Sequence, residues 1–352
     1  MIDLGNWRGK SVSTNDEALH NRHIAVIGSS GSRKTVQSQR MICSAVEQGC
    51  TVLALDLHGA LADDQIFWKY RPIFEQYGHD IDAHSDGITC PLFSPVRYSD
   101  GSVEDSIDTV GSITDVLATS FRLGCAQKAE LRSAVRFVYD SGGYETQGIR
   151  ALDRALRDAG SVPAQRVREK LYFLTEHNIF RPGDKLFCEQ KINIFRLSKF
   201  NLETQQTVAE MLLSYMWRLA NAGEFKANPI YIFVDECQNL PSGKDSALAQ
   251  MLSEGRKFGV NLILATQLIQ QGTASAVQQR ISQCGLMLYF KPAANLVGAT
   301  ARMIDSKAES DWSRLLRTLE VGEFIADGDF LIDGREHNGA LKVSAVIKDS
   351  EQ

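Results

Sequence analysis

The sequence lacks the features of several protein classes. No apolar run approaches the ~20 residues that a membrane-spanning helix needs, and the first residues contain no secretory segment. The seven cysteines are scattered, and none forms a Cys-x-x-Cys pair. This spacing argues against a disulfide framework or a zinc module. We therefore expect a cytoplasmic protein with reduced thiols and no membrane insertion.

An excess of positive charge is also missing. The 352 residues carry a formal net charge of −5 and are 43% hydrophobic and 23% charged, as in an ordinary globular protein. A protein that coats nucleic acid with its whole surface is usually basic. A ring whose pore alone is basic is still compatible with these numbers, because only the local field acts on the phosphates.

Short apolar runs alternate with helical patterns over most of the chain. Such runs are typical of strands covered on both faces in a largely parallel sheet, and they occur at 23–27, 51–55, 192–195, 230–234, 261–265 and 286–290. Between about 92 and 183 amphipathic helical spacing replaces them. The pattern predicts an α/β core at 1–90 and 191–352 with an all-α domain inserted at 91–190. After residue 307 it predicts a helix at about 309–319 and strands at 323–326 and 341–347.

The segment between the first predicted strand and its helix has the spacing of a phosphate-binding loop. It reads Gly28-Ser29-Ser30-Gly31-Ser32-Arg33-Lys34-Thr35 and departs from the pattern G-x-x-x-x-G-K-[ST] at one fixed position. Small residues let backbone N–H groups surround a phosphate chain, and the helix N-terminus adds a favourable dipole. We expect Lys34 to reach the β- and γ-phosphates of ATP and Thr35 to bind Mg²⁺. These features predict a RecA-like P-loop NTPase core.

The departure from the pattern is Arg33, which occupies a glycine position. A side chain there either crowds the phosphates or requires a strained backbone, although its charge suits them. Arg33 therefore bears more on catalytic competence than on nucleotide binding. A second Gly-Lys-Ser, within Gly5–Ser11, is one residue short and follows no predicted strand, so we interpret it as an edge turn.

A P-loop ATPase also needs carboxylates at the end of a neighbouring strand. The predicted strand 230–234 is followed by Asp235 and Glu236. We expect Asp235 to bind Mg²⁺ through water and Glu236 to polarise the attacking water. Such a pair can also serve as a helix N-cap. Its combination with the P-loop favours the catalytic interpretation.

Three further residues are candidates for a role in ATP hydrolysis. Gln267 ends a strand near the acidic pair, where it can sense the γ-phosphate or position water. Arg256 lies eleven residues earlier. It either caps a helix end, or it enters the site of a neighbouring subunit and stabilises the charge that develops on the transferred phosphoryl group. Arg280 is a second candidate for that role.

These motifs together resemble the FtsK/HerA superfamily of ring translocases, in particular its HerA-like and conjugative coupling-protein branches. The resemblance rests on 28–35, the Leu-Asp-Leu-His-Gly turn at 55–59, 230–236, Glu-Gly-Arg-Lys-Phe-Gly at 254–259 and Ala-Thr-Gln at 265–267. It implies a hexameric ring that hydrolyses ATP at subunit interfaces and moves DNA, preferably double-stranded, through its centre. By position, Arg256 matches an arginine that coupling proteins use in the neighbouring subunit's site.

Two other segments carry candidate ligands. Arg196 and Lys199 follow a core strand at the place where ring translocases have pore loops, and we assign them as candidate DNA contacts. The polar segment 79–84, with two histidines and two aspartates, offers metal-type ligands, but its composition favours a solvated loop.

The sequence leaves three functions open. The first is an ATP-driven DNA translocase with Mg²⁺ at each interface, acting either alone or with a separate partner protein such as a nuclease. The second is a nucleotide-binding oligomeric scaffold with weak hydrolysis that gates such a partner, an alternative motivated by Arg33. The third is a motor for the export of protein or single-stranded DNA.

Overall fold

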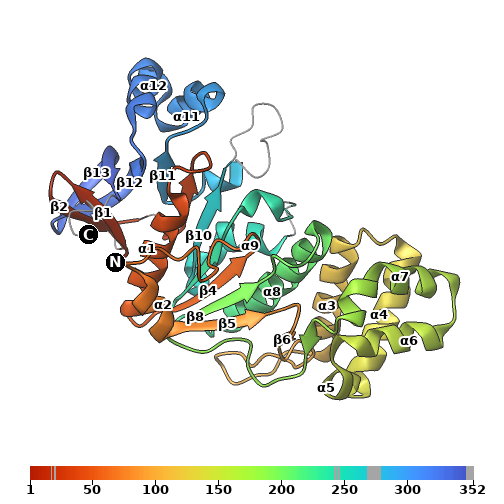
Figure 1. Cartoon of the computed structure of the whole chain (residues 1–352). Coiled ribbons are helices and arrows are strands. Elements are labelled where there is room, and N and C mark those ends of the chain that lie inside the picture. The colour runs from red at the N-terminus through yellow and green to blue at the C-terminus, as the bar shows by residue number, and fades with distance from the viewer. Residues whose placement is uncertain (17, 20, 242, 244–245, 268–278, 346–352) are drawn as a thin grey trace.

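The computed structural model describes residues 1–16, 18–19, 21–241, 243, 246–267 and 279–345. Its helices cover a large mixed sheet (Figure 1). The helices are α1 (Lys34–Glu47), α2 (Arg71–Tyr77), α3 (Ser106–Ser120), α4 (Cys125–Asp140), α5 (Gly143–Gln147), α6 (Ala151–Ala159), α7 (Val162–Glu176), α8 (Leu202–Ala222), α9 (Ala247–Glu254), α11 (Val297–Ile304) and α12 (Glu309–Thr318).

The strands of the sheet follow the order β13-β1-β2-β12-β11-β3-β10-β9-β4-β8-β5. They are β1 (Asp3–Trp7), β2 (Lys10–Thr14), β3 (Ile24–Ile27), β4 (Thr51–Asp56), β5 (Gly78–Asp82), β8 (Ile192–Arg196), β9 (Ile230–Val234), β10 (Val260–Thr266), β11 (Leu286–Phe290), β12 (Glu323–Ile332) and β13 (Arg335–Ser344). All pairings from β11 to β5 are parallel, and those among β11, β12, β13, β1 and β2 are antiparallel. The predicted α/β class with a mostly parallel sheet is therefore confirmed.

The two faces of the parallel strands are buried in two separate hydrophobic clusters. Ile24 and Val26 of β3 pack with α1 residues such as Met41, whereas Ala25 and Ile27 belong to the cluster that contains α8 and the helices α3–α7. Because both alternating sets of side chains are buried, the strands appear in the sequence as continuous apolar runs.

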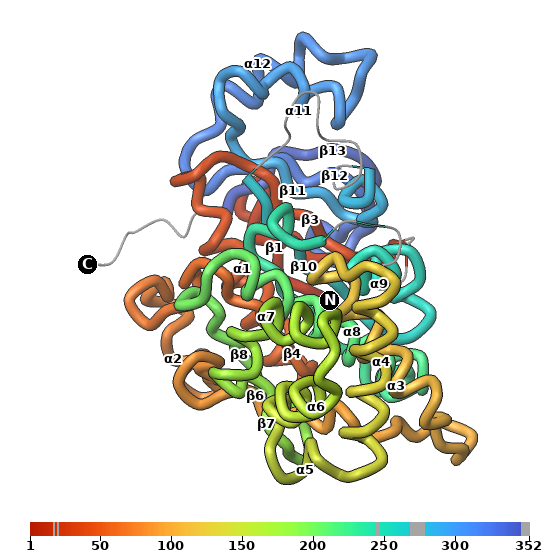
Figure 2. The backbone as a smooth tube through the Cα atoms, turned by 90° about the vertical axis from the view of Figure 1, so that its right-hand side faces the viewer, coloured from red at the N-terminus to blue at the C-terminus, as the bar shows by residue number. Residues whose placement is uncertain are grey.

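The helices α3–α7 follow one another between the short strands β6 (Ile88–Thr89) and β7 (Phe180–Arg181), which pair with each other. They gather at one end of the molecule in Figure 1 and lie in front of the sheet in the perpendicular view of Figure 2. A buried ion pair, in which Arg218 Nη2 of α8 lies 2.5 Å from Glu104 Oε2, joins the segment before α3 to the core. The boundaries 91–190 for a separate domain stay a prediction.

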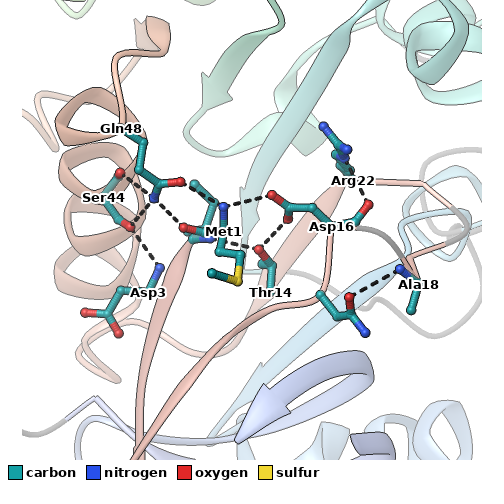
Figure 3. Close-up of polar contacts among 10 residues, drawn as sticks. Met1, Asp3, Thr14, Asp16, Ala18, Arg22, Ser44 and Gln48 are labelled. Atoms are coloured by element: carbon teal, nitrogen blue, oxygen red, sulfur yellow. Dashed lines mark hydrogen bonds and ion pairs between the residues drawn. The ribbon is translucent and has the colours of Figure 1, made fainter. Parts of the chain in front are cut away.

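The structure corrects the prediction that 23–27 is the first strand. β1 and β2 precede it as a hairpin, and the predicted edge turn at Gly5–Ser11 contains its two-residue connection, Arg8 (φ 50°) and Gly9 (φ 84°). Positive φ at both positions suits a tight turn that matches strand twist. The hairpin is fastened to α1, where Asp3 N donates to Ser44 Oγ at 2.9 Å and the Met1 ammonium donates to Gln48 Oε1 at 2.8 Å (Figure 3).

The predicted loop at 79–84 is also corrected, because 78–82 forms the edge strand β5, which pairs in parallel with β8. An edge strand needs backbone partners on one side only, so its exposed residues can be polar. Nor do its histidines form a metal site: among the described residues, no three His, Cys, Asp or Glu side chains gather to hold an ion. No helix within that part of the chain is long and apolar enough to cross a membrane.

Candidate nucleotide site

The carboxyl ends of the parallel strands bring the predicted site residues to one edge of the sheet. Leu55 of β4 and Leu264 of β10 both pair with Val234 of β9. Asp56 and Asp235 therefore lie side by side at the strand ends, with Glu236 next along the chain. The P-loop follows β3 on the other side of β10. Ligands of open α/β sheets bind at this edge.

The P-loop is held by backbone contacts on both sides. Gly28 N donates to Thr266 O at 3.3 Å, and Ser29 N donates to Lys291 O at 3.1 Å. A Cβ on Gly28 would lie 2.5 Å from the Cβ of Phe290, so only glycine fits beside β11. Ser32 Oγ closes the loop by donating to Ser29 O at 2.8 Å.

Arg33 adopts the left-handed conformation, with φ 70° and ψ 25°, immediately before α1. A residue with a Cβ pays roughly 1–2 kcal/mol for this conformation, which glycine adopts freely. Of the two alternatives that the sequence left for Arg33, the strained backbone is thus present. The Arg33 side chain is exposed and makes no capping hydrogen bond to the first turn of α1. The N–H groups of that turn can therefore serve an anion.

Lys34 is buried at the start of α1, and its Nζ donates to Ser29 O at 3.0 Å. Burial lowers the pKa of Lys34, and the carboxylates of Glu236 and Asp235 oppose that shift. The lysine is therefore within the electrostatic reach of both acids. Thr35 follows it in the first turn of α1 and is half-buried. The residue types and their placement match a lysine that reaches phosphates and a hydroxyl that binds a metal.

Asp235 is buried near two other acids. Burial raises the pKa of Asp235 to about 6, with further contributions from the carboxylates of Glu236 and Asp56. Burial also raises the pKa of Asp56, whose Oδ1 accepts from both Gly59 N and Ala60 N at 2.8 Å. Asp56 therefore forms the turn after β4, as the sequence indicated. A cation beside Asp235 favours its charged form and so opposes both the burial and the repulsion that raise its pKa.

Glu236 has a positive φ of 48°, and amides hold its two carboxylate oxygens. Gln267 Nε2 donates to Oε1, and Gln238 Nε2 donates to Oε2 at 2.6 Å. Gln238 Oε1 in turn accepts from Thr266 Oγ1 at 2.6 Å. The structure thus brings Glu236 and Gln267 together as predicted. The sequence reasoning missed Gln238, although it is the next polar residue after the acidic pair.

The residues of this site fit Mg²⁺ and a nucleotide. Mg²⁺ prefers oxygen ligands and is usually held by one or two carboxylates together with phosphates and water. Asp235 and the Thr35 hydroxyl supply that kind of donor. The N–H groups of the first turn of α1, which the Arg33 side chain does not cap, and the Lys34 ammonium supply the groups that a phosphate chain needs.

Arg256 lies far from the site of its own chain. It is exposed in the short helix η3 (Gly255–Phe258), which precedes β10, whereas Gln267 follows β10. Seven residues of strand separate the two ends by roughly 23 Å. Arg256 therefore cannot serve the site of its own chain. Arg280 is half-buried and lines a small apolar cavity beside Cys237, the residue after Glu236.

The two candidate DNA contacts form ion pairs. Arg196 Nη2 lies 2.8 Å from Asp80 Oδ1 and 3.3 Å from Asp63 Oδ1. Lys199 Nζ lies 2.5 Å from Asp82 Oδ2. Nearby carboxylates thus offset the charge of both cations, and a DNA contact by either residue stays a prediction.

The strand order, the P-loop and the acidic strand end define a P-loop NTPase fold with a RecA-like core. No family model matches the chain. A probable helicase of Methanocaldococcus jannaschii is 22% identical over 372 residues, covering 96% of this chain and 64% of that protein. This chain thus spans less than two thirds of its relative.

Solved structures with the same fold confirm that class. VirB4 of Thermoanaerobacter pseudethanolicus superposes with a TM-score of 0.70 at 16% identity, over 98% of this chain and 96% of that chain. The plasmid coupling protein TrwB with a non-hydrolysable ATP analogue gives 0.58 at 15% identity, over 93% and 86%. TrwB with ADP and Mg²⁺ gives 0.57 at 14% identity, over 93% and 85%. The predicted resemblance to coupling proteins is confirmed at the level of the fold.

Proposed function

We propose that this chain is an ATP-hydrolysing motor that forms a ring and moves double-stranded DNA. The observation that carries the proposal is Glu236, a carboxylate held by two glutamines beside the buried Lys34 and the P-loop. Two findings support the proposed binding and hydrolysis of ATP: the chain shares its fold with VirB4 and TrwB, and structures of TrwB contain nucleotides. The resemblance to ring translocases supports the proposed movement of DNA.

The proposed reaction assigns a task to each residue. The P-loop N–H groups and Lys34 hold the phosphates, while Thr35 and Asp235 hold Mg²⁺. When bound, Mg²⁺ neutralises charge that develops on the phosphates. Glu236 accepts a proton from the attacking water as a general base, and Gln267 and Gln238 hold its carboxylate in one orientation. Arg256 lies at the opposite end of β10 from the site of its own chain. Its task in this proposal is to complete the site of a neighbouring subunit, as the resemblance to coupling proteins implies.

Steady-state ATP hydrolysis with and without long double-stranded DNA tests this proposal. We expect turnover that depends on Mg²⁺ and rises with DNA, and that falls at least ~100-fold in Glu236→Gln, since general-base catalysis contributes 10²–10⁴-fold. The matched control is Glu145→Gln, a carboxamide substitution in the remote helix α5. ATP binding with no turnover under any condition contradicts the motor proposal.

The strained Arg33 favours a second candidate, a nucleotide-binding scaffold with weak hydrolysis that gates a partner such as a nuclease. Arg33 occupies a conformation that favours glycine, directly beside Lys34. If the loop is impaired in this way, Arg33→Gly raises the ATP turnover sharply. Unchanged or lower turnover in Arg33→Gly argues against the scaffold.

A further inference from the structure

A cavity lies between the helices α3 and α4 and the helices α8 and α9 of the core, which are neighbours in Figure 2. Its volume is about 420 Å³, and none of its described lining residues belongs to the candidate nucleotide site. Binding sites for small organic molecules usually measure roughly 300–1,000 Å³. A water molecule takes only about 30 Å³. The cavity is therefore large enough for an organic ligand.

Glu210 of α8 lines this cavity and is only 4% exposed. Its Oε1 accepts from Ala247 N of α9 at 2.7 Å, whereas its Oε2 has no hydrogen-bond partner among the described residues. The large majority of buried polar side-chain atoms in folded proteins have such a partner. The Glu210 carboxylate can thus accept a further hydrogen bond from a ligand.

The charges around the cavity select the sign of that ligand. Lys128 Nζ lies 2.8 Å from Asp115 Oδ1, and Arg218 Nη2 lies 2.5 Å from Glu104 Oε2. Both cations of the lining are paired in this way, whereas no described cation pairs with Glu210. Burial raises the pKa of Glu210 to about 7, so above that pH the cavity carries one unbalanced negative charge.

The rest of the lining suits a ligand that has an apolar part. Trp217 and Val116 are half-buried and contribute apolar surface. The Trp217 ring is held by an edge contact with Phe258, at 5.2 Å between the ring centroids. The donor set suits a bare metal ion poorly, because among the described residues no three His, Cys, Asp or Glu side chains gather at one place.

We propose that this cavity binds a small organic cation. Its ammonium or guanidinium group donates to the Glu210 carboxylate, and its apolar part packs against Trp217 and Val116. Hydrogen bonds between ionised groups are the stronger ones, and apolar contact adds to them. Because the lining comes from α3 and α4 on one side and from α8 and α9 on the other, the bound cation contacts both the inserted helices and the core. This site does not depend on nucleotide binding.

Calorimetric titration at pH 8 with two probes of matched shape tests the proposal. Phenethylammonium and 2-phenylethanol share a phenyl ring and a two-carbon chain, but only the first carries a charge. We expect the wild-type chain to bind phenethylammonium about tenfold more tightly or better, as a hydrogen bond between charged groups predicts. Glu210→Gln keeps an acceptor for Ala247 N but removes the charge, so it should abolish this preference. Glu169→Gln, at an exposed position of α7, is the matched control and should retain it.

A second variant tests the location without changing a charge. Ser214 of α8 is half-buried and lines the cavity, so Ser214→Leu fills part of its volume. We expect it to weaken phenethylammonium binding about tenfold or more, and circular dichroism checks that both variants are folded. Equal affinity of the wild-type chain for the two probes overturns the proposal, and so does failure to bind either. Unchanged binding of phenethylammonium in Glu210→Gln or in Ser214→Leu overturns it as well.

Discussion

The Nε2 atom of Gln238 lies 2.6 Å from Glu236 Oε2, although Gln238 is only two residues further along the chain. This contact is possible because Glu236 has a positive φ of 48°, which begins a tight turn directly after β9. The hydroxyl Oγ1 of Thr266, at the end of β10, donates a hydrogen bond to the amide oxygen Oε1 of Gln238 at 2.6 Å. Gln238 thus links the catalytic candidate to the neighbouring strand.

Gln238 is therefore expected to position Glu236 rather than to touch the substrate. Gln238→Leu keeps a similar volume but removes both hydrogen bonds, so the Glu236 carboxylate loses its fixed orientation. We expect kcat for ATP to fall about tenfold while KM changes less than twofold. Steady-state kinetics beside Gln165→Leu, at an exposed position of α7, measure this. A rise in KM with constant kcat contradicts the positioning role.

Arg33 provides a prediction for stability. Replacing it with glycine removes a strained left-handed residue, but it also increases the freedom of the unfolded chain. We expect a net gain of up to about 1 kcal/mol in the free energy of unfolding, measured by denaturant titration. The matched control is Arg122→Gly, since Arg122 has a φ of 48° outside the site. The two variants should gain similar stability. Destabilisation by Arg33→Gly alone would mean that its side chain holds the loop.

Glu210 of α8 predicts a pH dependence of stability. It is buried, its Oε1 accepts from Ala247 N at 2.7 Å, and burial raises its pKa from the ordinary value of 4.5 to about 7. Between these values the folded chain holds a proton that the unfolded chain releases, so Glu210 lowers stability as the pH rises from about 4.5 to 7. Glu210→Gln mimics the protonated acid and removes this contribution.

Denaturant titrations at pH 5 and pH 8 measure that contribution. Relative to the wild-type chain, Glu210→Gln should gain about 3 kcal/mol of unfolding free energy between the two pH values. Glu169→Gln, at an exposed position of α7, is the control and should gain nothing. A constant difference between Glu210→Gln and the wild-type chain at both pH values would contradict the prediction.

Much of the fold and the site is predictable from sequence because the signals are local. The strand, loop and helix around Lys34, and the strand before Asp235, each lie within one short segment. β1 and β2 were missed because they alternate in polarity and take partners from the far end of the chain, as Asn6 does with Ser344. β5 was missed because an edge strand tolerates exposed polar residues. Gln238 was missed because its contact depends on the backbone turn at Glu236.

The position of Arg256 leads to a complementation experiment. The proposed role of Arg256 requires an intact Glu236 and an intact Arg256 on the two sides of one interface between neighbouring chains. Glu236→Gln and Arg256→Ala should each be inactive alone. Mixed rings should recover about a quarter of the wild-type ATP turnover, since some interfaces combine an intact Glu236 with an intact Arg256. No recovery on mixing contradicts a role of Arg256 across the interface.

The most direct test of the motor is ATP-driven displacement of a third strand from a long DNA duplex. A translocating ring pushes a labelled triplex-forming strand off the duplex, which gel electrophoresis detects. We predict displacement by the wild-type chain with ATP and Mg²⁺, and none with a non-hydrolysable ATP analogue or with Glu236→Gln. ATP hydrolysis without displacement would contradict the motor and would favour the nucleotide-gated scaffold.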